Sequence, residues 1–171
     1  MFTISQDNLE SSSMTTWILN QNNLTKFLKE SNLEPYFEKS SGLIYINILA
    51  NDHELPLFFV IRSEGEVLQL ICYFPYQLSD THQGATARLL HLLNRDIDIP
   101  GFGMDEEQGL IFYRLVIPCL EKHISGPLLR VYIDTVKIIS DSFSHAIGLV
   151  STGNMNLDEM KKLAKEKAQE S

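Results

Sequence analysis

The chain has 171 residues, of which 44% are hydrophobic and 21% are charged, and its formal net charge is −8. This length allows one well-formed core and is short for two domains, and the composition is that of an ordinary globular protein. The acidic balance argues against nucleic acid as a partner, because binding to a polyanion requires clustered Lys and Arg side chains.

The two cysteines and the N-terminal residues limit where the protein works. Cys72 and Cys119 each lie in an apolar run, which is typical of small buried hydrophobic residues. The N-terminal residues lack the basic and apolar regions of a secretory signal. No apolar stretch approaches the ~20 residues that cross a bilayer. We therefore expect a cytoplasmic protein without membrane insertion.

The first predicted element after the polar residues 1–13 is an amphipathic helix that ends near Ser31. Its apolar residues recur at helical spacing: Trp17, Ile18, Leu24, Phe27 and Leu28. The Asn-rich residues 20–23 disfavour a helix interior, so the alternative is that the helix begins only there. Residues 1–13 themselves are rich in serine, and we expect them to form a flexible leader.

Strand-like segments then alternate with a second helix. Three runs rich in β-branched and aromatic residues predict an antiparallel meander, at 42–49, 55–61 and 67–74. A helix with an apolar stripe follows and stops before Pro100; the stripe is Ala85, Leu89, Leu92 and Leu93. Residues 101–104 and 110–117 predict a hairpin around the acidic turn 105–109.

The C-terminal part completes the predicted fold. Residues from Gly126 to Gly148 predict the longest helix, because they carry a broad apolar face and begin with Pro127. The order α-βββ-α-ββ-α, plus a short C-terminal helix from Asn156, predicts an α+β two-layer sandwich. It consists of an antiparallel sheet of about five strands with helices on one face. We expect one domain at 14–150 and a charged amphipathic tail at 151–171.

No group of residues predicts catalysis or a bound metal. The five histidines include no i, i+4 pair that would bind a metal on one helical face. Signatures of an activated nucleophile and phosphate-binding glycine loops are absent. The acidic run Asp105–Glu107 lacks the ligand spacing of a calcium loop and is typical of a solvated turn. The sequence therefore predicts a protein that is not an enzyme and needs no cofactor and no metal.

The stretch from Ala87 to Gly103, together with the order of elements, resembles the YbjN family, whose fold is similar to that of the class I type III secretion chaperones. The family pattern has a helix ending in Asn, an extended link, a Gly-aromatic strand, an acidic turn and a strand ending in an apolar residue and Pro. Here these features are Asn94, Gly101-Phe102, the turn 105–109 and Ile117-Pro118. The resemblance covers residues 20 to 150 and is most specific at 87–118.

The resemblance implies a chaperone-like domain that binds other proteins. The chaperone relatives are small acidic homodimers that hold an extended stretch of a secreted effector against apolar grooves. A dimer interface is implied at the second helix and the strand after it: Leu89, Leu92, Leu93, Ile97 and Ile99. Candidates for a partner-binding groove are Leu24, Phe27, Leu28, Tyr45, Phe59 and Tyr73. For both sets, ordinary core packing is the alternative.

Three functions follow as hypotheses. The first is a non-enzymatic protein-binding module that holds an extended segment of a partner, such as a secreted effector, as a homodimer. The second is a YbjN-like regulator that acts through protein contacts. The third is a small-ligand-binding protein or enzyme with a site in the crevice between sheet and helices. A deep polar pocket holding a carboxylate or histidine with a strongly shifted pKa would favour the third.

Overall fold

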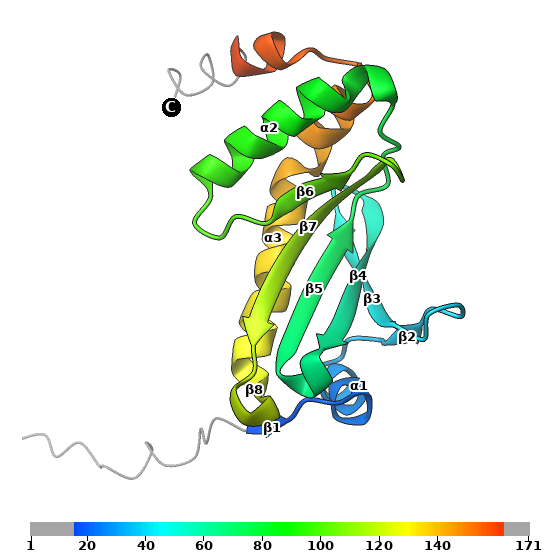
Figure 1. Ribbon diagram of the computed structural model, residues 1–171, viewed down its shortest axis with the longest axis vertical. Helices are drawn as coiled ribbons and strands as arrows, with labels where there is room; N and C mark the ends of the chain where they lie inside the picture. Colours follow the sequence, from blue (N-terminus) through cyan, green and yellow to red (C-terminus); the bar gives the residue numbers. More distant parts are fainter. Residues whose placement is uncertain (1–15, 163–171) are drawn as a thin grey trace, which may run out of the picture.

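The computed structural model describes residues 16–162 and contains an antiparallel sheet with helices packed on one face (Figure 1). The six strands lie in the order β2-β3-β4-β5-β7-β6. The predicted α+β class is confirmed, and the sheet has one strand more than expected. The additional strand, β2, contains only Tyr36–Phe37 and pairs with β3. Two residues are too few to leave an alternating pattern in the sequence.

The elements have the following bounds. The strands are β1 Thr16–Ile18, β2 Tyr36–Phe37, β3 Ile44–Ala50, β4 His53–Arg62, β5 Val67–Tyr73, β6 Phe102–Asp105, β7 Leu110–Pro118 and β8 His123–Ser125. The α-helices are α1 Gln21–Glu30, α2 Gln83–Asp96 and α3 Gly126–Ser151, and short 3₁₀ turns lie at Ser63–Gly65, Asp80–His82 and Leu120–Lys122.

The start of the described chain differs from the predicted helix. Trp17 and Ile18 belong to β1, which pairs with β8, and α1 begins only at Gln21. The side chain of Asn20 accepts a hydrogen bond from the N–H of Asn23 at 2.9 Å. Asparagine suits this position because its oxygen satisfies an unpaired N–H of the first turn. The prediction of a helix through Trp17 was wrong, and the alternative start at the Asn-rich residues is confirmed. The expected leader, 1–13, lies outside the described residues.

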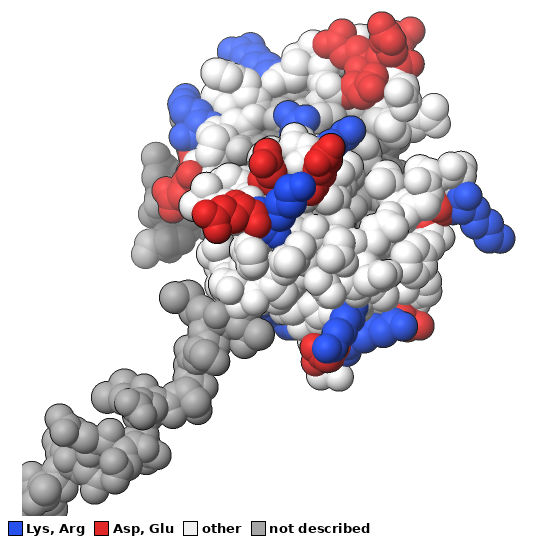
Figure 2. Space-filling model, turned by 60° about the horizontal axis from the view of Figure 1, so that its bottom comes forward, with Lys and Arg blue, Asp and Glu red and all other residues white. Residues whose placement is uncertain are grey.

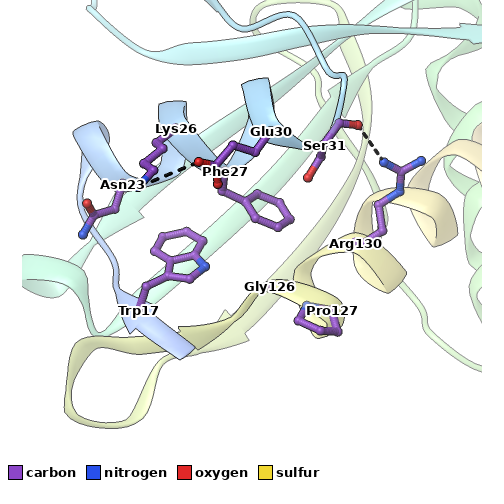
Figure 3. A pocket seen from close by; sticks show the side chains of 9 residues that line it. All are labelled: Trp17, Asn23, Lys26, Phe27, Glu30, Ser31, Gly126, Pro127 and Arg130. Atoms are coloured by element: carbon purple, nitrogen blue, oxygen red, sulfur yellow. Dashed lines mark hydrogen bonds and ion pairs between the residues drawn. The ribbon is translucent and has the colours of Figure 1, made fainter. Parts of the chain in front are cut away.

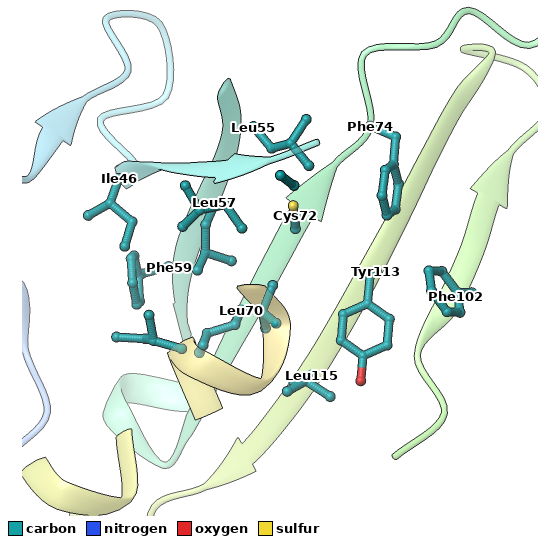
Figure 4. Packing of buried hydrophobic residues seen from close by; sticks show 14 of the residues in the cluster. Ile46, Leu55, Leu57, Phe59, Leu70, Cys72, Phe74, Phe102, Tyr113 and Leu115 are labelled. Atoms are coloured by element: carbon teal, nitrogen blue, oxygen red, sulfur yellow. The ribbon is translucent and has the colours of Figure 1, made fainter. Parts of the chain in front are cut away.

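The core lies between α3 and one face of the sheet (Figure 4). Along β3, β4, β5 and β7, alternate residues are buried, because successive side chains of a strand point to opposite faces. Buried side chains on this inner face include Ile46, Leu57, Leu70 and Tyr113. α3 contacts β3, β5 and β7, and α2 packs against α3 and β6. The inner face therefore carries most of the hydrophobic stabilisation.

The side chain of Asn94, near the end of α2, fixes the beginning of β6. Its Oδ1 accepts hydrogen bonds from the N–H groups of Gly101 at 3.0 Å and Phe102 at 2.9 Å. Its Nδ2 donates to the carbonyl of Phe102 at 2.9 Å. The family pattern of a helix ending in Asn before a Gly-aromatic strand thus has a structural reason. The amide joins the end of α2 to the edge strand of the sheet, and we call its three hydrogen bonds the Asn94 clamp.

The end of the described chain packs against the domain. α3 ends at Ser151, and residues 157–162 are helical again. The N–H of Glu159 donates to Asn156 Oδ1 at 2.9 Å, and the N–H of Asn156 donates to Glu159 Oε2 at 3.2 Å. This reciprocal pair is a capping box. Leu157 is buried in the core cluster. The predicted C-terminal helix is therefore present at its start, and residues 163–171 lie outside the described part.

Candidate functional site

The outer face of the sheet, opposite α3, carries a row of aromatic side chains. Each ring comes from a different strand: Tyr36 in β2, Tyr45 in β3, Phe58 in β4, Tyr73 in β5 and Phe112 in β7. We call these five residues the aromatic ladder. Tyr36 is exposed, and the other four are half-buried. Within residues 16–162, no helix covers this face, so the rings are accessible to a partner.

The rings of the aromatic ladder contact one another in sequence across the sheet. Centroid distances are 5.5 Å from Tyr36 to Tyr45 and 5.2 Å from Tyr45 to Phe58. They are 5.8 Å from Phe58 to Tyr73 and 6.1 Å from Tyr73 to Phe112. These spacings lie in the range of favourable stacked and edge-to-face pairs. The strand register creates the row, because it places Tyr36 opposite Tyr45, Tyr45 opposite Phe58, and Tyr73 opposite Phe112.

Two neighbours hold the far end of the aromatic ladder in place. Gly103 in β6 pairs with Phe112, and a Cβ added at Gly103 would lie 2.7 Å from Cζ of that ring. The ring therefore lies over the glycine backbone, where a larger residue would displace it. The guanidinium of Arg114 lies 5.8 Å from the centre of the Phe112 ring, within the range of a cation–π contact. The row thus ends on a positive charge at the edge of the sheet.

The edge of β7 next to this point has no neighbouring strand among residues 16–162. β6 pairs only with residues 110–113 of β7, and the N–H of Arg114 donates to the carbonyl of Gly101 at 2.9 Å. Backbone groups of alternate residues point to the same edge of a strand, so the N–H and C=O of Val116 point outward there. A hollow of about 620 Å³ adjoins this edge; Phe112, Arg114, Val116 and Tyr132 are among the residues that line it.

A second hollow, of about 510 Å³, lies between β1, α1 and the start of α3 (Figure 3). The rings of Trp17 and Phe27 form part of its wall, 5.6 Å apart. Its cations already have partners. Lys26 lies 3.8 Å from a carboxylate oxygen of Glu30, and Arg130 donates to the carbonyl of Ser31 at 3.2 Å. No unpaired charge among the side chains of Figure 3 therefore points to a particular ligand.

The structure divides the predicted partner-binding residues between core and surface. Tyr45 and Tyr73 lie in the aromatic ladder, and Phe27 lines the second hollow. Leu24, Leu28 and Phe59 are buried in the core, where a bound segment would not touch them. The sequence interpretation missed Tyr36, Phe58 and Phe112. No signal within a single strand could have found them, because only the register between β3 and β4 places Phe58, and not Phe59, on the same face as Tyr45.

The residues predicted to form a dimer interface contribute little exposed surface. Leu89 is buried, while Leu92, Leu93 and Ile97 are half-buried and pack against the core cluster. Ile99 is 39% exposed and lines the hollow beside β7. Core packing thus accounts for most of this set in the isolated chain.

Burial shifts the pKa values of both cysteines and of Tyr113. Burial raises the pKa of the Cys72 thiol to about 11 and that of Cys119 above its usual value, so both thiols are poor nucleophiles. Burial also raises the pKa of Tyr113 to about 12, and its hydroxyl donates to the carbonyl of Ile99 at 2.7 Å. Within residues 16–162, no three His, Cys, Asp or Glu side chains are grouped to hold a metal ion.

Charged side chains are dispersed on the face shown in Figure 2. Most Lys and Arg side chains stand next to Asp or Glu there, one group of Asp and Glu side chains stands without them at the upper right, and no continuous basic patch is visible. The expectation that nucleic acid is not the partner therefore still rests on the net charge of −8. Among the described residues, no helix has the length and apolar character needed to cross a membrane.

Comparison with known proteins identifies the family. No curated protein matches the chain by sequence. The family model YbjN, described as "Putative bacterial sensory transduction regulator", matches residues 20–149. The matched region runs from the cap of α1 almost to the end of α3, and it includes the aromatic ladder and the Asn94 clamp. The chain belongs to the YbjN family.

Proposed function

We propose that the protein is a non-enzymatic protein-binding module, and that its aromatic ladder holds an extended segment of a partner protein. The observation that carries this proposal is the row of five contacting rings on a sheet face that no described helix covers. Aromatic side chains lose little conformational entropy on binding and offer large contact areas, which is why they dominate protein interfaces. Exposed apolar surface of this kind is typical of an interaction site.

The outward edge of β7 supports an extended conformation for the bound segment. A partner strand placed beside Val116 could donate to and accept from its backbone groups, which have no partner strand among residues 16–162. From there, the segment would reach the hollow lined by Phe112 and Arg114 and continue across the outer face, over the rings of the aromatic ladder. Strand addition supplies affinity through the backbone, and the rings supply selectivity for apolar side chains.

The family description favours a second version of this function. A regulator of sensory transduction acts through contacts with other proteins, and the same open face would serve it. The chaperone version adds two claims, namely that the segment belongs to a secreted effector and that two copies of the chain act together as a homodimer. The two versions share the binding face, so one binding experiment tests what they have in common.

The test is the selection of binding peptides followed by substitution on the open face. Peptides from a phage-displayed library of random linear sequences would be selected on the wild-type protein. The affinity of the best one would then be measured for Phe58→Ser and Phe37→Ser. Phe37 is the matched control, because it is 55% exposed and adjacent to Tyr36 but outside the aromatic ladder. We expect Phe58→Ser to weaken binding about tenfold or more and Phe37→Ser to leave it nearly unchanged.

Circular dichroism would first show that both variants are folded. NMR shift mapping on the wild-type protein provides a second reading that needs no substitution, and the largest shifts are expected at Tyr45, Phe58, Tyr73 and Val116. The proposal fails if the library yields no binder, if the shifts lie on the helices, or if the two variants weaken binding equally.

A further inference from the structure

α3 exposes an apolar stripe on the side away from the sheet. Leu128, Val131 and Ile138 are 47%, 61% and 65% exposed, although all three are large aliphatic residues. With the small residues Thr135 and Ser142 between and beyond them, they recur every three or four residues along the helix. This spacing places them on one side of α3, and the buried residues Leu129, Ile133 and Val136 lie on the other side.

Charged residues border this stripe on one flank only. Arg130, Asp134, Lys137 and Asp141 recur at spacings of four, three and four, so they form a second row beside the first. Arg130 Nε donates to Asp134 Oδ2 at 3.2 Å, and both side chains are about half exposed. The opposite flank carries the half-buried apolar residues Tyr132, Ile139 and Phe143, which pack against the core cluster. The charges along the row alternate in sign and sum to zero.

We propose that a second copy of this chain docks on the α3 stripe, with the two α3 helices antiparallel about a two-fold axis near Thr135. Residues equally distant from the axis then face each other. Leu128 of one copy lies opposite Ser142 of the other, and Val131 lies opposite Ile138 to within one helical rise of about 1.5 Å. In the charged row, Arg130 lies opposite Asp141, and Asp134 lies opposite Lys137. Every charge in the row meets one of opposite sign.

The symmetry argument distinguishes this arrangement from a parallel one. A two-fold axis between antiparallel helices brings each flank against the same flank of the other copy. The charged row of one copy therefore lies against the charged row of the other, in the reverse direction. Because the charges from Arg130 to Asp141 are +, −, + and −, this reversal places opposite charges across from each other. In a parallel pair, the charged row would meet Tyr132 and Ile139, which would bury charges against apolar side chains. The small residues at 135 and 142 allow the two helices to approach closely.

The contact is small. From Leu128 to Ser142 the stripe is about 21 Å long at ~1.5 Å per residue. An interface of two helices over this length is at the low end of specific interfaces, so we expect a dissociation constant in the micromolar range. The proposal specifies the surface for the homodimer included in the proposed function. The test of the dimer requires no peptide. A failure of the α3 dimer proposal can therefore be told from a failure of the proposed peptide binding at the aromatic ladder.

Analytical ultracentrifugation of the full chain, from micromolar to several hundred micromolar concentration, is the first test. We expect a reversible dimer for the wild type, and a dissociation constant raised about tenfold or more by Val131→Asp. Ile99→Asp is the matched control, because Ile99 is also exposed but belongs to the interface implied by the chaperone relatives. A wild-type monomer at all concentrations, or a dimer lost with Ile99→Asp and retained with Val131→Asp, would overturn the proposal.

Charge reversal tests the register. Asp134→Lys alone and Lys137→Asp alone each place like charges opposite one another across the axis and should weaken the dimer. The double variant Asp134→Lys/Lys137→Asp restores opposite pairs and should bring the dissociation constant back toward that of the wild type. A double variant that is weaker than both single variants would exclude the antiparallel register. We expect the helix to stay intact in these variants, because charge pairs within a helix contribute only about 0.5 kcal/mol or less. Circular dichroism checks this.

Disulfide formation locates the axis. Thr135→Cys lies at the proposed two-fold axis and should form a covalent dimer on mild oxidation, because only residues at the axis meet their own copies. Leu128→Cys alone should not, whereas a mixture of Leu128→Cys and Ser142→Cys chains should. The natural Cys72 and Cys119 are buried and do not compete. Cross-linking of Leu128→Cys with itself, without cross-linking of Thr135→Cys, would refute the proposed axis.

Discussion

The two faces of the sheet are made by alternate residues of the same strands, yet they have different surroundings. Phe59 points to the inner face, is 2% exposed and packs in the core beneath α3. Phe58, the residue before it, points to the outer face and contacts Tyr45 and Tyr73 in the aromatic ladder. The contrast between these neighbours shows that residue type and strand membership do not assign a role. For this pair, the parity of the position within the strand decides on which face of the sheet the ring lies.

The inner face and the outer face of the sheet also differ in how many polar side chains they carry. Buried residues between the inner face and α3 are aliphatic or aromatic, apart from a few hydroxyl and thiol groups, such as Cys72 in β5 and Ser140 in α3, whose hydroxyl donates to Cys72 Sγ at 3.5 Å. The outer face mixes rings with polar residues such as Asn47 and Arg114, which is typical of a surface that is stable in water and can also bind a partner. Substitutions on the two faces should therefore have separable effects on stability and binding.

The pair Phe59→Ala and Phe58→Ala should give the largest contrast. Removal of the buried Phe59 ring leaves a cavity, and we expect unfolding free energy to fall by about 3–5 kcal/mol. Removal of Phe58 loses cross-strand ring contacts at a half-buried position, with an expected loss of about 1 kcal/mol. Urea unfolding of both variants measures the difference. Equal losses would mean that the outer face is as much part of the core as the inner one.

Asn94→Ala should have the next largest effect, because it removes the clamp on the edge of the sheet. Three hydrogen bonds are lost, and the backbone groups of Gly101 and Phe102 lose a partly buried partner. We expect about 1–3 kcal/mol of destabilisation. Hydrogen exchange should become faster at the Gly101 and Phe102 amides.

Asn47→Ala is the matched control for this clamp. Asn47 lies on the exposed outer face, and its side chain donates to Glu54 at 3.2 Å. We expect a change within about 0.5 kcal/mol. If Asn94→Ala is as mild as Asn47→Ala, with slow exchange at the Gly101 amide, the clamp does not hold β6.

The smallest effect concerns the loop that follows Tyr36, at the open end of the aromatic ladder. Glu38 accepts hydrogen bonds from the hydroxyl and backbone N–H groups of Ser41 and Ser40, and these lower its pKa from 4.5 to about 2. A lowered pKa stabilises the folded state above pH 4.5, and that contribution is lost as the pH falls toward 2. Ser41→Ala should raise the pKa of Glu38, as measured by NMR titration of its carboxyl carbon.

Ser142→Ala provides the control for that titration, because the hydroxyl of Ser142 donates within α3 and has no bond to this loop. It should leave the pKa of Glu38 near 2. A wild-type pKa of Glu38 close to 4.5 would show that the loop does not hold the carboxylate in solution. The placement of Tyr36 at the end of the aromatic ladder would then lack this support.

Local patterns in the sequence were sufficient for most of the fold. The alternation in β3 to β5, the glycine-containing turns and the apolar face of α3 each predict their elements, because they depend on residues close together in the chain. The prediction of a helix at Trp17 failed because the structure of that segment depends on residues far away in the chain. β1 is a strand because it pairs with β8, more than one hundred residues later, and no local signal reports such a partner.

The sequence by itself determined the α+β class, the order of the main elements, the positions of the Asn94 motif and the acidic character of the surface. Only the tertiary structure decided which aromatic residues form the aromatic ladder, and that Phe59, Leu24 and Leu28 belong to the core. It also decided which side of α3 remains exposed, at Val131 and Ile138. The physical reason is that burial depends on strand register and on which side of a helix meets the sheet. Both are set by contacts between distant segments.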